Sequence, residues 1–320
     1  MNKRMLGNGR MVSSIGLGCM GMDHAYGRPA PREDMVTLLH HAVDLGCTFF
    51  DTAIAYGEAN EEVLGEAFSS MRDRVVLATK FGIAGHRFVD GKPAHLLDSK
   101  PASIRRQVEG SLRRLRTEYI DLCYQHRVDP DVEPETVAET MRALMREGKI
   151  LGWGLSNAPV EYLERAHAVA PLAAVQNQYS MMWREPERGL FDLCAAMNIA
   201  FVAYSPLGNG FLSGRFTRDT VYGEGDFRGF MRRFRPEVME RNQSLLELIR
   251  DVALSKRATP AQIVLAWELA QRPFVIPIPG TTKIARLEEN LGAASMEFSG
   301  GELAAINAAL DRITVDETYF

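Results

Sequence analysis

Four residues that can donate or hold a proton lie in or just after three short apolar segments of the chain. Asp51 ends the segment FFD and Tyr56 follows it closely, while Lys80 ends LATK and His126 ends DLCYQH. A tyrosine is a poor acid near neutral pH because its usual pKa is about 10, but a lysine ammonium against the phenol oxygen favours the phenolate and lowers that pKa. An aspartate keeps such a lysine charged, and a histidine can donate to a substrate oxygen on which charge develops. An aspartate, a tyrosine, a lysine and a histidine together therefore suit proton transfer, with Tyr56 as the donor.

This chemistry requires a scaffold that brings the four residues to one place, and the sequence predicts one. Amphipathic helical segments separate most of a set of short apolar runs, such as the helix after Pro101 and the helix that a capping box begins at Thr259. The runs fit parallel strands buried on both faces. The eight runs are Ile15–Cys19, Thr48–Ala53, Val75–Lys80, Ile120–His126, Leu151–Ser156, Ala174–Gln178, Ala200–Ser205 and Val275–Pro279. Eight strands alternating with helices predict an α/β fold, the (β/α)8 TIM barrel, whose active site lies at the carboxyl ends of the strands.

Two segments fall outside this alternation. Met5–Leu17 predicts an N-terminal β-hairpin with Gly7 to Gly9 at its turn. Leu207–Pro236, after the seventh strand, is long and glycine-rich, which favours a binding loop or lid over a linker. Because no linker or charge block divides the chain, we expect residues 1–320 to form a single domain.

Composition and charge exclude several classes of protein. The chain is 46% hydrophobic and 24% charged, with a formal net charge of -4, so its overall charge indicates no nucleic-acid or anionic-membrane partner. We expect a cytoplasmic protein, because no apolar run has transmembrane length and the N-terminus lacks the apolar core of a signal peptide. The four cysteines form no C-x-x-C pair, which predicts reduced core residues and no metal site. The basic and aromatic segment 227–235 is interpreted as a solvated loop.

The other strand ends are also polar, and with them the chain resembles the aldo-keto reductase family. The matching blocks cover essentially the whole chain in that family's order: FFDTAIAYG, VVLATKFG, DLCYQHRVDP, GWGLSNA, VQNQYS, AYSPLG and PIPGTTKIARLEEN. The sequence is most similar to the branch that includes perakine reductase and microbial relatives. The resemblance implies NADPH-dependent reduction of an aldehyde or ketone, with Asp51, Tyr56, Lys80 and His126 as the catalytic tetrad. The implied partner is a small carbonyl substrate.

The resemblance also implies a cofactor site. Ser156, Asn157 and Gln178 match residues that bind the nicotinamide carboxamide, and Tyr204 matches the ring on which the nicotinamide stacks. The segment for the pyrophosphate comprises Ser205, Pro206, Leu207, Gly208 and Gly210. The segment for the ribose 2'-phosphate and the adenine comprises Thr281, Thr282, Lys283, Arg286, Glu289 and Asn290, and we assign Met20 and Gly280 to the cofactor site as well.

The expected preference for a phosphate has a physical basis and one weakness. Lys283 and Arg286 stand at the start of a predicted helix, where cations are unfavourable unless an anion meets them. Gly280 stands where many members of the family carry a lysine, so NADH is possible as a weaker alternative cofactor. We expect the substrate pocket to be walled by residues 20–28, 81–92, 128–131 and 181–184 and by Tyr319 and Phe320.

Other interpretations explain parts of the sequence. Residues 16–21 spell G-x-G-x-x-G, but Gly27, Pro29 and Pro31 follow instead of the helix that a dinucleotide fingerprint must open. Tyr56 and Lys80 are too far apart for the one-helix dyad of a short-chain dehydrogenase. A Schiff-base lyase that uses Lys80 stays open, although it leaves the phosphate segment unexplained. A second alternative that stays open is a nicotinamide-binding regulatory or redox-sensing barrel with little turnover, similar to potassium-channel β subunits.

Overall fold

Eight parallel strands form the centre of the molecule, as the sequence predicts. The computed structural model describes residues 1–23, 25–89 and 92–317. Neighbouring strands pair in the order β3, β4, β5, β8, β9, β10, β11, β12, and each overlaps one of the predicted segments. Their bounds are β3 (Leu17–Gly18), β4 (Phe49–Asp51), β5 (Val76–Phe81), β8 (Leu122–Gln125), β9 (Trp153–Ser156), β10 (Ala174–Gln178), β11 (Ala200–Tyr204) and β12 (Val275–Pro277).

The first and last strands meet, and this contact closes the sheet into a barrel. The amide of Gly16 donates to the carbonyl of Pro277 at 3.0 Å, and Gly18 forms a parallel bridge with Gly280. The seam requires glycine, because a Cβ on Gly18 would lie 2.7 Å from the carbonyl oxygen of Ile278. The predicted (β/α)8 barrel is therefore confirmed.

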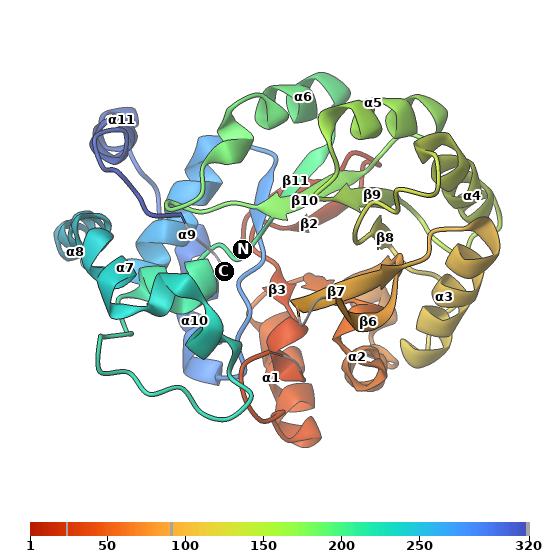
Figure 1. Cartoon of the computed structure of the whole chain (residues 1–320), viewed down its shortest axis with the longest axis horizontal. Coiled ribbons are helices and arrows are strands. Elements are labelled where there is room, and N and C mark those ends of the chain that lie inside the picture. The colour runs from red at the N-terminus through yellow and green to blue at the C-terminus, as the bar shows by residue number, and fades with distance from the viewer. Residues whose placement is uncertain (24, 90–91, 318–320) are drawn as a thin grey trace.

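Helices surround the strands on the outside of the barrel (Figure 1). Thr259 and Gln262 form the predicted capping box, in which Thr259 Oγ1 accepts from the Gln262 amide at 3.3 Å. The helices that follow the strands are α1 (Arg32–Asp44), α2 (Glu58–Phe68), α3 (Pro101–Arg114), α4 (Pro134–Arg146), α5 (Val160–Val169), α6 (Leu190–Met197), α9 (Pro260–Gln271) and α10 (Ile284–Gly292). Three more lie at the periphery: α7 (Pro236–Arg241), α8 (Gln243–Lys256) and α11 (Gly300–Leu310). Among the described residues, no helix is long and apolar enough to span a membrane.

The hydrophobic core has two layers, and the inner layer forms a floor beneath the polar strand ends. Phe49, Tyr124 and Val202 pack together inside the barrel. The predicted N-terminal hairpin, formed by β1 (Lys3–Met5) and β2 (Met11–Ser13), adds Leu6 and Val12 to this inner cluster. A larger cluster fills the space between strands and helices, and all four cysteines are free and buried, as expected. Polar side chains at the strand ends are therefore held above an apolar interior.

One segment that was expected to be a loop is regular structure. Residues 81–92 were expected only to wall the pocket, but β6 (Ile83–Val89) and β7 (Lys92–Leu97) pair as an antiparallel hairpin after β5. This hairpin lies in front of the barrel strands in Figure 1. It places Ile83 and His95 on the wall of the central cavity.

The interpretation of segment 227–235 as a solvated loop is wrong for its most important residues. Arg233 is 0% exposed and donates from Nη1 to Asn209 Oδ1 at 3.1 Å. Phe234 is buried beside it, whereas Arg232 and Arg235 are exposed. A buried guanidinium needs hydrogen-bond acceptors, which a folded segment supplies. The long connection is therefore not a solvated loop but is packed onto the barrel, and it contains short 3-10 turns.

Candidate active site

The lysine ammonium at the end of β5 organises the predicted tetrad. Lys80 is 1% exposed, and its Nζ donates to Thr52 O at 2.9 Å and to Tyr56 OH at 3.4 Å. The third bond is a short ion pair with Asp51 Oδ1. An ammonium has three donors, so Lys80 is fully used and fixed in direction. Asp51 ends β4 and Tyr56 ends the 3-10 turn Ile54–Tyr56, which explains how both reach Lys80.

His126 completes the group from the end of β8. Its ring meets the Tyr56 ring edge to face, with centroids 5.8 Å apart and planes at 89°. The backbone amide of His126 donates to Phe81 O at 2.8 Å, which ties the turn after β8 to the end of β5. The structure thus brings all four predicted residues together, and Asp51, Tyr56 and His126 line one cavity while Lys80 lies behind them.

The pKa of Tyr56 differs from the sequence expectation. Burial raises the pKa of Tyr56 above its usual value, and the Lys80 ammonium opposes this rise without reversing it. Arg127, next to His126, also lowers the pKa of Tyr56. Sequence reasoning considered the lysine but not the cost of desolvating a phenolate. The phenol therefore stays protonated through neutral pH, which is the state a proton donor needs.

Gln176 is a residue of this site that the sequence prediction missed. Its Nε2 donates to Asp51 Oδ2 at 2.8 Å from β10, and its side chain is buried. Burial raises the pKa of Asp51, while Lys80 and Gln176 lower it. A signal existed in the sequence, because side chains two apart on a strand share a face and Gln178 was already expected to point into the barrel.

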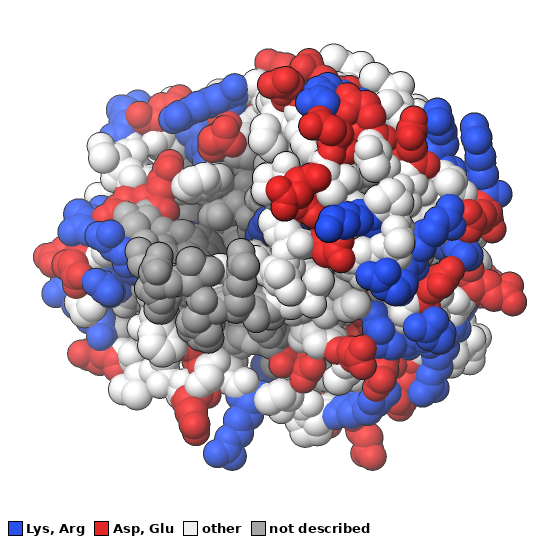
Figure 2. All heavy atoms as spheres, turned by 45° about the vertical axis from the view of Figure 1, so that its right-hand side comes forward, with Lys and Arg blue, Asp and Glu red and all other residues white. Residues whose placement is uncertain are grey.

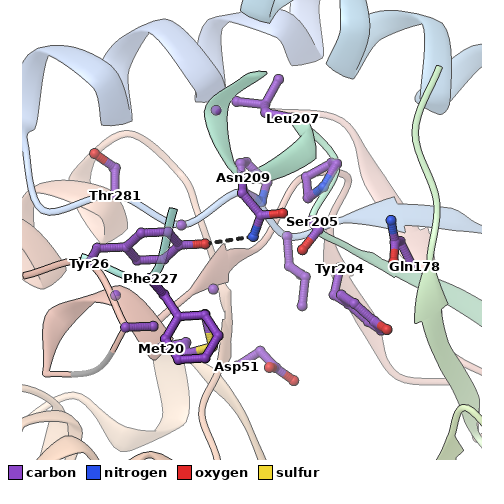
Figure 3. A pocket seen from close by; sticks show the side chains of 18 of the residues that line it. Met20, Tyr26, Asp51, Gln178, Tyr204, Ser205, Leu207, Asn209, Phe227 and Thr281 are labelled. Carbon is purple, nitrogen blue, oxygen red and sulfur yellow. Dashed lines mark hydrogen bonds between the residues drawn. The ribbon is translucent and has the colours of Figure 1, made fainter. Parts of the chain in front are cut away.

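Three tetrad residues and the first turn of α10 line the same cavity of about 700 Å³. Figure 3 shows Asp51 from the tetrad and Thr281 from the segment that leads into α10. Most of the predicted cofactor residues line this cavity. They are Met20, Ser156, Gln178, Tyr204, Ser205, Pro206, Leu207, Gly210, Gly280, Thr281, Thr282, Lys283, Arg286, Glu289 and Asn290. Among the residues that the structure describes, Asn157 and Gly208 are not part of the lining.

Asn157 acts behind the cavity wall, where it holds two lining residues. Tyr204 OH donates to Asn157 Oδ1 at 3.0 Å, and Asn157 Nδ2 donates to Ser156 Oγ at 2.9 Å. Gln178 Nε2 is buried and has no hydrogen-bond partner among the described residues. This donor, together with the Ser156 hydroxyl and the Tyr204 ring, fits a planar ligand that carries an amide.

The turn after β11 has a backbone shape suited to an anion. Ser205, Gly208, Asn209 and Gly210 have φ values of 51°, 56°, 59° and 95°. Left-handed residues next to right-handed ones can turn backbone N–H groups toward one point, as in anion-binding nests. Within this turn the amides of Gly208 and Gly210 already donate to Ser205 O and Leu207 O, each at 2.9 Å. A Cβ on Gly208 would lie 2.8 Å from Met182 Sδ, so glycine is required there for space as well as for its φ.

The far end of the cavity is cationic. Lys283 is the N-cap of α10 and Arg286 lies in its first turn. Burial lowers the pKa of Arg286, and the nearby charges of Arg215 and Arg228 lower it further. Such a cluster is stabilised when an anion binds to it.

The presence of glycine at position 280, where many members of the family carry a lysine, has a steric explanation. A Cβ on Gly280 would lie 2.8 Å from the carbonyl oxygen of Gly18. The tight closure of the barrel therefore disfavours a lysine here, and Arg215 and Arg228 add positive charge from the long connection instead. Neither arginine had been assigned to the site, because their distance in sequence from α10 gave no signal.

Two loops meet beside the cavity, and this contact was also not predicted. Tyr26 OH accepts from Asn209 Nδ2 at 2.9 Å, the bond drawn in Figure 3. The amide of Phe227 donates to Ala25 O at 2.8 Å. Arg228 pairs with Asp226 and lies 5.1 Å from the centroid of the Tyr26 ring. The loop after β3 and the long connection after β11 are thus joined by backbone, polar and cation–π contacts.

Other expectations about the pocket have mixed outcomes. Met20 and Tyr26 line it as predicted, but residues 128–131 and 181–184 are not among the described lining residues. Tyr319 and Phe320 lie outside the described residues. The rejection of the G-x-G-x-x-G segment is confirmed, because β3 leads to the three-residue 3-10 turn Met20–Met22 and the next α-helix begins only at Arg32.

The molecular surface shows no strong separation of charge on the face seen in Figure 2. Lys and Arg side chains intermingle with Asp and Glu side chains over this face. Ion pairs between elements include Arg165 with Glu133 and Arg105 with Glu147.

Comparison with known proteins agrees with this fold. The model of the aldo/keto reductase family matches residues 14–311, so the chain belongs to this family. A probable aldo-keto reductase of Glycine max is 40% identical over 301 residues, which span 93% of this chain and 86% of that protein.

Solved structures share the architecture. The glycerol dehydrogenase of Gluconobacter oxydans superposes with a TM-score of 0.86 at 28% identity, covering 99% of this chain and 98% of that one. An aldo-keto reductase from Klebsiella pneumoniae, solved in complex with NADPH, gives a TM-score of 0.75 at 29% identity, with 96% and 95% of the two chains covered. Another structure of such an enzyme from Klebsiella pneumoniae, in complex with NADP and acetate, gives 0.75 at 29% identity and covers 99% of each chain.

Proposed function

We propose that this protein reduces an aldehyde or ketone with NADPH, with Tyr56 as the general acid. One observation carries the proposal: a buried Lys80 joins Asp51 to the Tyr56 hydroxyl at one end of a cavity whose other end is cationic. Membership of the aldo/keto reductase family supports carbonyl reduction. The Klebsiella pneumoniae relatives, solved with NADPH or NADP, support the cofactor.

The residues of the cavity fit NADPH along its length. Gln178 Nε2 and the Ser156 hydroxyl would hold the nicotinamide carboxamide, with Asn157 fixing Tyr204 beside them. The turn Ser205–Gly210 would hold the pyrophosphate through the backbone N–H groups that are not used within the turn, since those of Gly208 and Gly210 donate to Ser205 O and Leu207 O. Lys283 and Arg286 would bind the 2'-phosphate, with Arg215 and Arg228 adding positive charge. When bound, NADPH supplies the hydride that reduces the carbonyl carbon.

The tetrad supplies the proton. Tyr56 donates its hydroxyl proton to the carbonyl oxygen as negative charge develops on that oxygen. His126, edge to face with the Tyr56 ring, helps to hold the oxygen. Lys80 then stabilises the phenolate that Tyr56 becomes, and Asp51 keeps Lys80 charged. In the reverse direction the Tyr56 phenolate accepts the proton of an alcohol.

The environment of Lys80 argues against a Schiff-base lyase. A lysine nucleophile must be neutral and accessible to the substrate carbonyl. Burial lowers the pKa of Lys80, but Asp51 and Tyr56 outweigh this effect and the pKa lies above its usual value. Its side chain is 1% exposed and all three donors are used. Lys80 is therefore a charged, fixed group and not an amine ready to attack.

A panel of aldehydes and ketones tests the proposal and separates an enzyme from a regulatory barrel. The loss of reduced-cofactor absorbance is followed with NADPH and then with NADH. We expect turnover of at least some aldehydes, with NADPH preferred. Tight NADPH binding without turnover of any carbonyl in the panel would instead identify a nicotinamide-binding regulatory protein.

A further inference from the structure

Arg127 places a cation at the substrate end of the cavity. It follows His126 directly after β8, and its side chain lines the cavity beside Tyr56 and His126. The lining of the same cavity also includes the apolar or aromatic residues Met20, Ile83 and Phe227 and the polar residue His95. Arg127 follows β8, whereas Lys283 and Arg286 follow β12, four strands away in the barrel order, so the two positive regions face different parts of the cavity.

Within residues 1–23, 25–89 and 92–317, the guanidinium of Arg127 has no carboxylate partner. Its recorded hydrogen bond runs from Nη1 to the carbonyl oxygen of His126 at 2.6 Å, and no Asp or Glu in the described part of the chain forms an ion pair with it. Two other arginines of the cavity wall are paired, Arg215 with Glu289 and Arg228 with Asp226. A guanidinium has five N–H donors, so the bond to His126 leaves donors for a ligand.

The position of the charge limits what this ligand can be. Arg127 is bonded to the backbone of His126, whose ring meets the Tyr56 ring, and its charge lowers the pKa of Tyr56, so an anion bound to Arg127 lies near the reacting carbonyl. The planar fork of a guanidinium matches the two oxygens of a carboxylate. Apolar side chains around it would contact the carbon skeleton between the two groups.

We propose that Arg127 is a specificity-determining residue that binds a carboxylate carried by the substrate, so that the preferred substrates are aldehydes or ketones with an acid group on the same small molecule. This inference rests on the proposed reductase function. It goes beyond that function because it assigns a substrate class and a residue that does not belong to the tetrad.

A matched pair of aldehydes tests the substrate class. The pair is 4-carboxybenzaldehyde and its neutral isostere 4-carbamoylbenzaldehyde. A second pair, 3-carboxybenzaldehyde and 3-carbamoylbenzaldehyde, varies the distance between the aldehyde and the acid or amide group. For the wild type, kcat/KM should favour the acid over the amide in at least one pair. In Arg127→Met this preference should fall by about 10-fold to 100-fold, the usual range for a lost charge-assisted hydrogen bond. Arg127→Lys should recover part of it.

The control is Arg146→Met, which removes the same charge from an exposed arginine outside the cavity lining. It should keep the wild-type preference. Arg127→Met also removes a charge that lowers the pKa of Tyr56, but the resulting rise affects both aldehydes of a pair equally, so the ratio reports binding of the carboxylate alone. The proposal is overturned if the wild type shows no preference for the acid, or if Arg127→Met keeps it.

Equilibrium titration separates this proposal from the reductase function itself. Benzoate and benzamide are titrated calorimetrically into the protein with NADP+ present. The wild type should bind benzoate more tightly, and Arg127→Met should lose the difference. If the difference survives in Arg127→Met, Tyr56 and His126 bind the carboxylate and the inference is wrong. If no aldehyde is reduced but the binding of benzoate depends on Arg127, the proposed reductase function is wrong while the proposed anion site is supported.

Discussion

The side-chain amide of Gln176 donates a hydrogen bond to Asp51 from the far side of the barrel, with 2.8 Å between Nε2 and Oδ2. Asp51 thus receives Lys80 on one oxygen and Gln176 on the other. Both bonds stabilise the ionised carboxylate in a place where burial raises its pKa. The charge that orients Lys80 toward Tyr56 therefore depends on a residue outside the tetrad.

Gln176→Leu should lower kcat by about 10-fold, because a buried carboxylate oxygen loses its donor. The pKa of Asp51 should rise further, so the activity should be lost at a higher pH as the solution is made acidic. NADPH affinity should change little. The measurement is a kcat–pH profile with fluorescence titration of NADPH. A profile that keeps its shape and position would show that Gln176 only fills space.

Arg286→Ala should weaken NADPH by about 10-fold to 100-fold through loss of a charge-assisted bond to the 2'-phosphate. NADH lacks this phosphate, so the binding of NADH should weaken much less. The dissociation constants of both cofactors are measured by quenching of protein fluorescence. Arg218→Ala is the control, since Arg218 is exposed, pairs with Glu240 and is not a lining residue. Equal weakening of the two cofactors would show that Arg286 does not read the phosphate.

Tyr26→Phe should speed the release of NADPH by about 3-fold to 10-fold, the effect of one neutral hydrogen bond. The lost bond joins Tyr26 to Asn209 and so holds the loop after β3 against the long connection. Stopped-flow fluorescence gives the release rate. Tyr119→Phe is a matched control, because Tyr119 does not line the cavity. An unchanged release rate would mean that the two loops do not control cofactor exit.

Glu268 should make the protein less stable at high pH. Its carboxyl oxygens have no hydrogen-bond partner among the described residues, and burial raises the pKa of Glu268 well above its usual value. A folded-state pKa above the unfolded one means that stability is lost as the pH rises above the unfolded pKa, because the unfolded state releases the proton more easily. The loss is absent at lower pH, where both states are protonated.

Glu268→Leu should therefore raise the melting temperature at pH 8 by about 3 °C or more. The gain should shrink at pH 5, where the wild-type carboxyl is closer to its neutral form in both states. Thermal unfolding followed by circular dichroism at the two pH values gives the comparison. A lower melting temperature in Glu268→Leu at both pH values would show that Glu268 is stabilised in the folded protein.

The sequence predicted the barrel and the tetrad because both depend on local patterns. Buried parallel strands are continuous apolar runs, and the polar residue that ends each run must lie at the barrel mouth. Loop packing could not be predicted in this way. The burial of Arg233, the contact of Tyr26 with Asn209 and the hairpin of β6 and β7 depend on tertiary contacts that leave no periodic signal. That residues 1–320 form a single domain stays a prediction.

The pKa of Tyr56 shows a second limit of sequence reasoning. The identity of Lys80 predicts a lowering, but the size of the opposing desolvation depends on how deeply the phenol is buried. Gln176 was missed although its spacing from Gln178 on the strand could have indicated the direction of its side chain, and its partner Asp51 depends on a tertiary contact.

Tyr56→Phe tests the central claim most directly, because it removes the phenol proton and keeps the ring that meets His126. Single-turnover reduction of an accepted aldehyde is followed by loss of NADPH absorbance, with NADPH affinity measured on the same preparation. Reduction should fall by about 100-fold or more while NADPH binds as in the wild type. Aldehyde reduction at the wild-type rate by Tyr56→Phe would contradict the role of Tyr56 as proton donor.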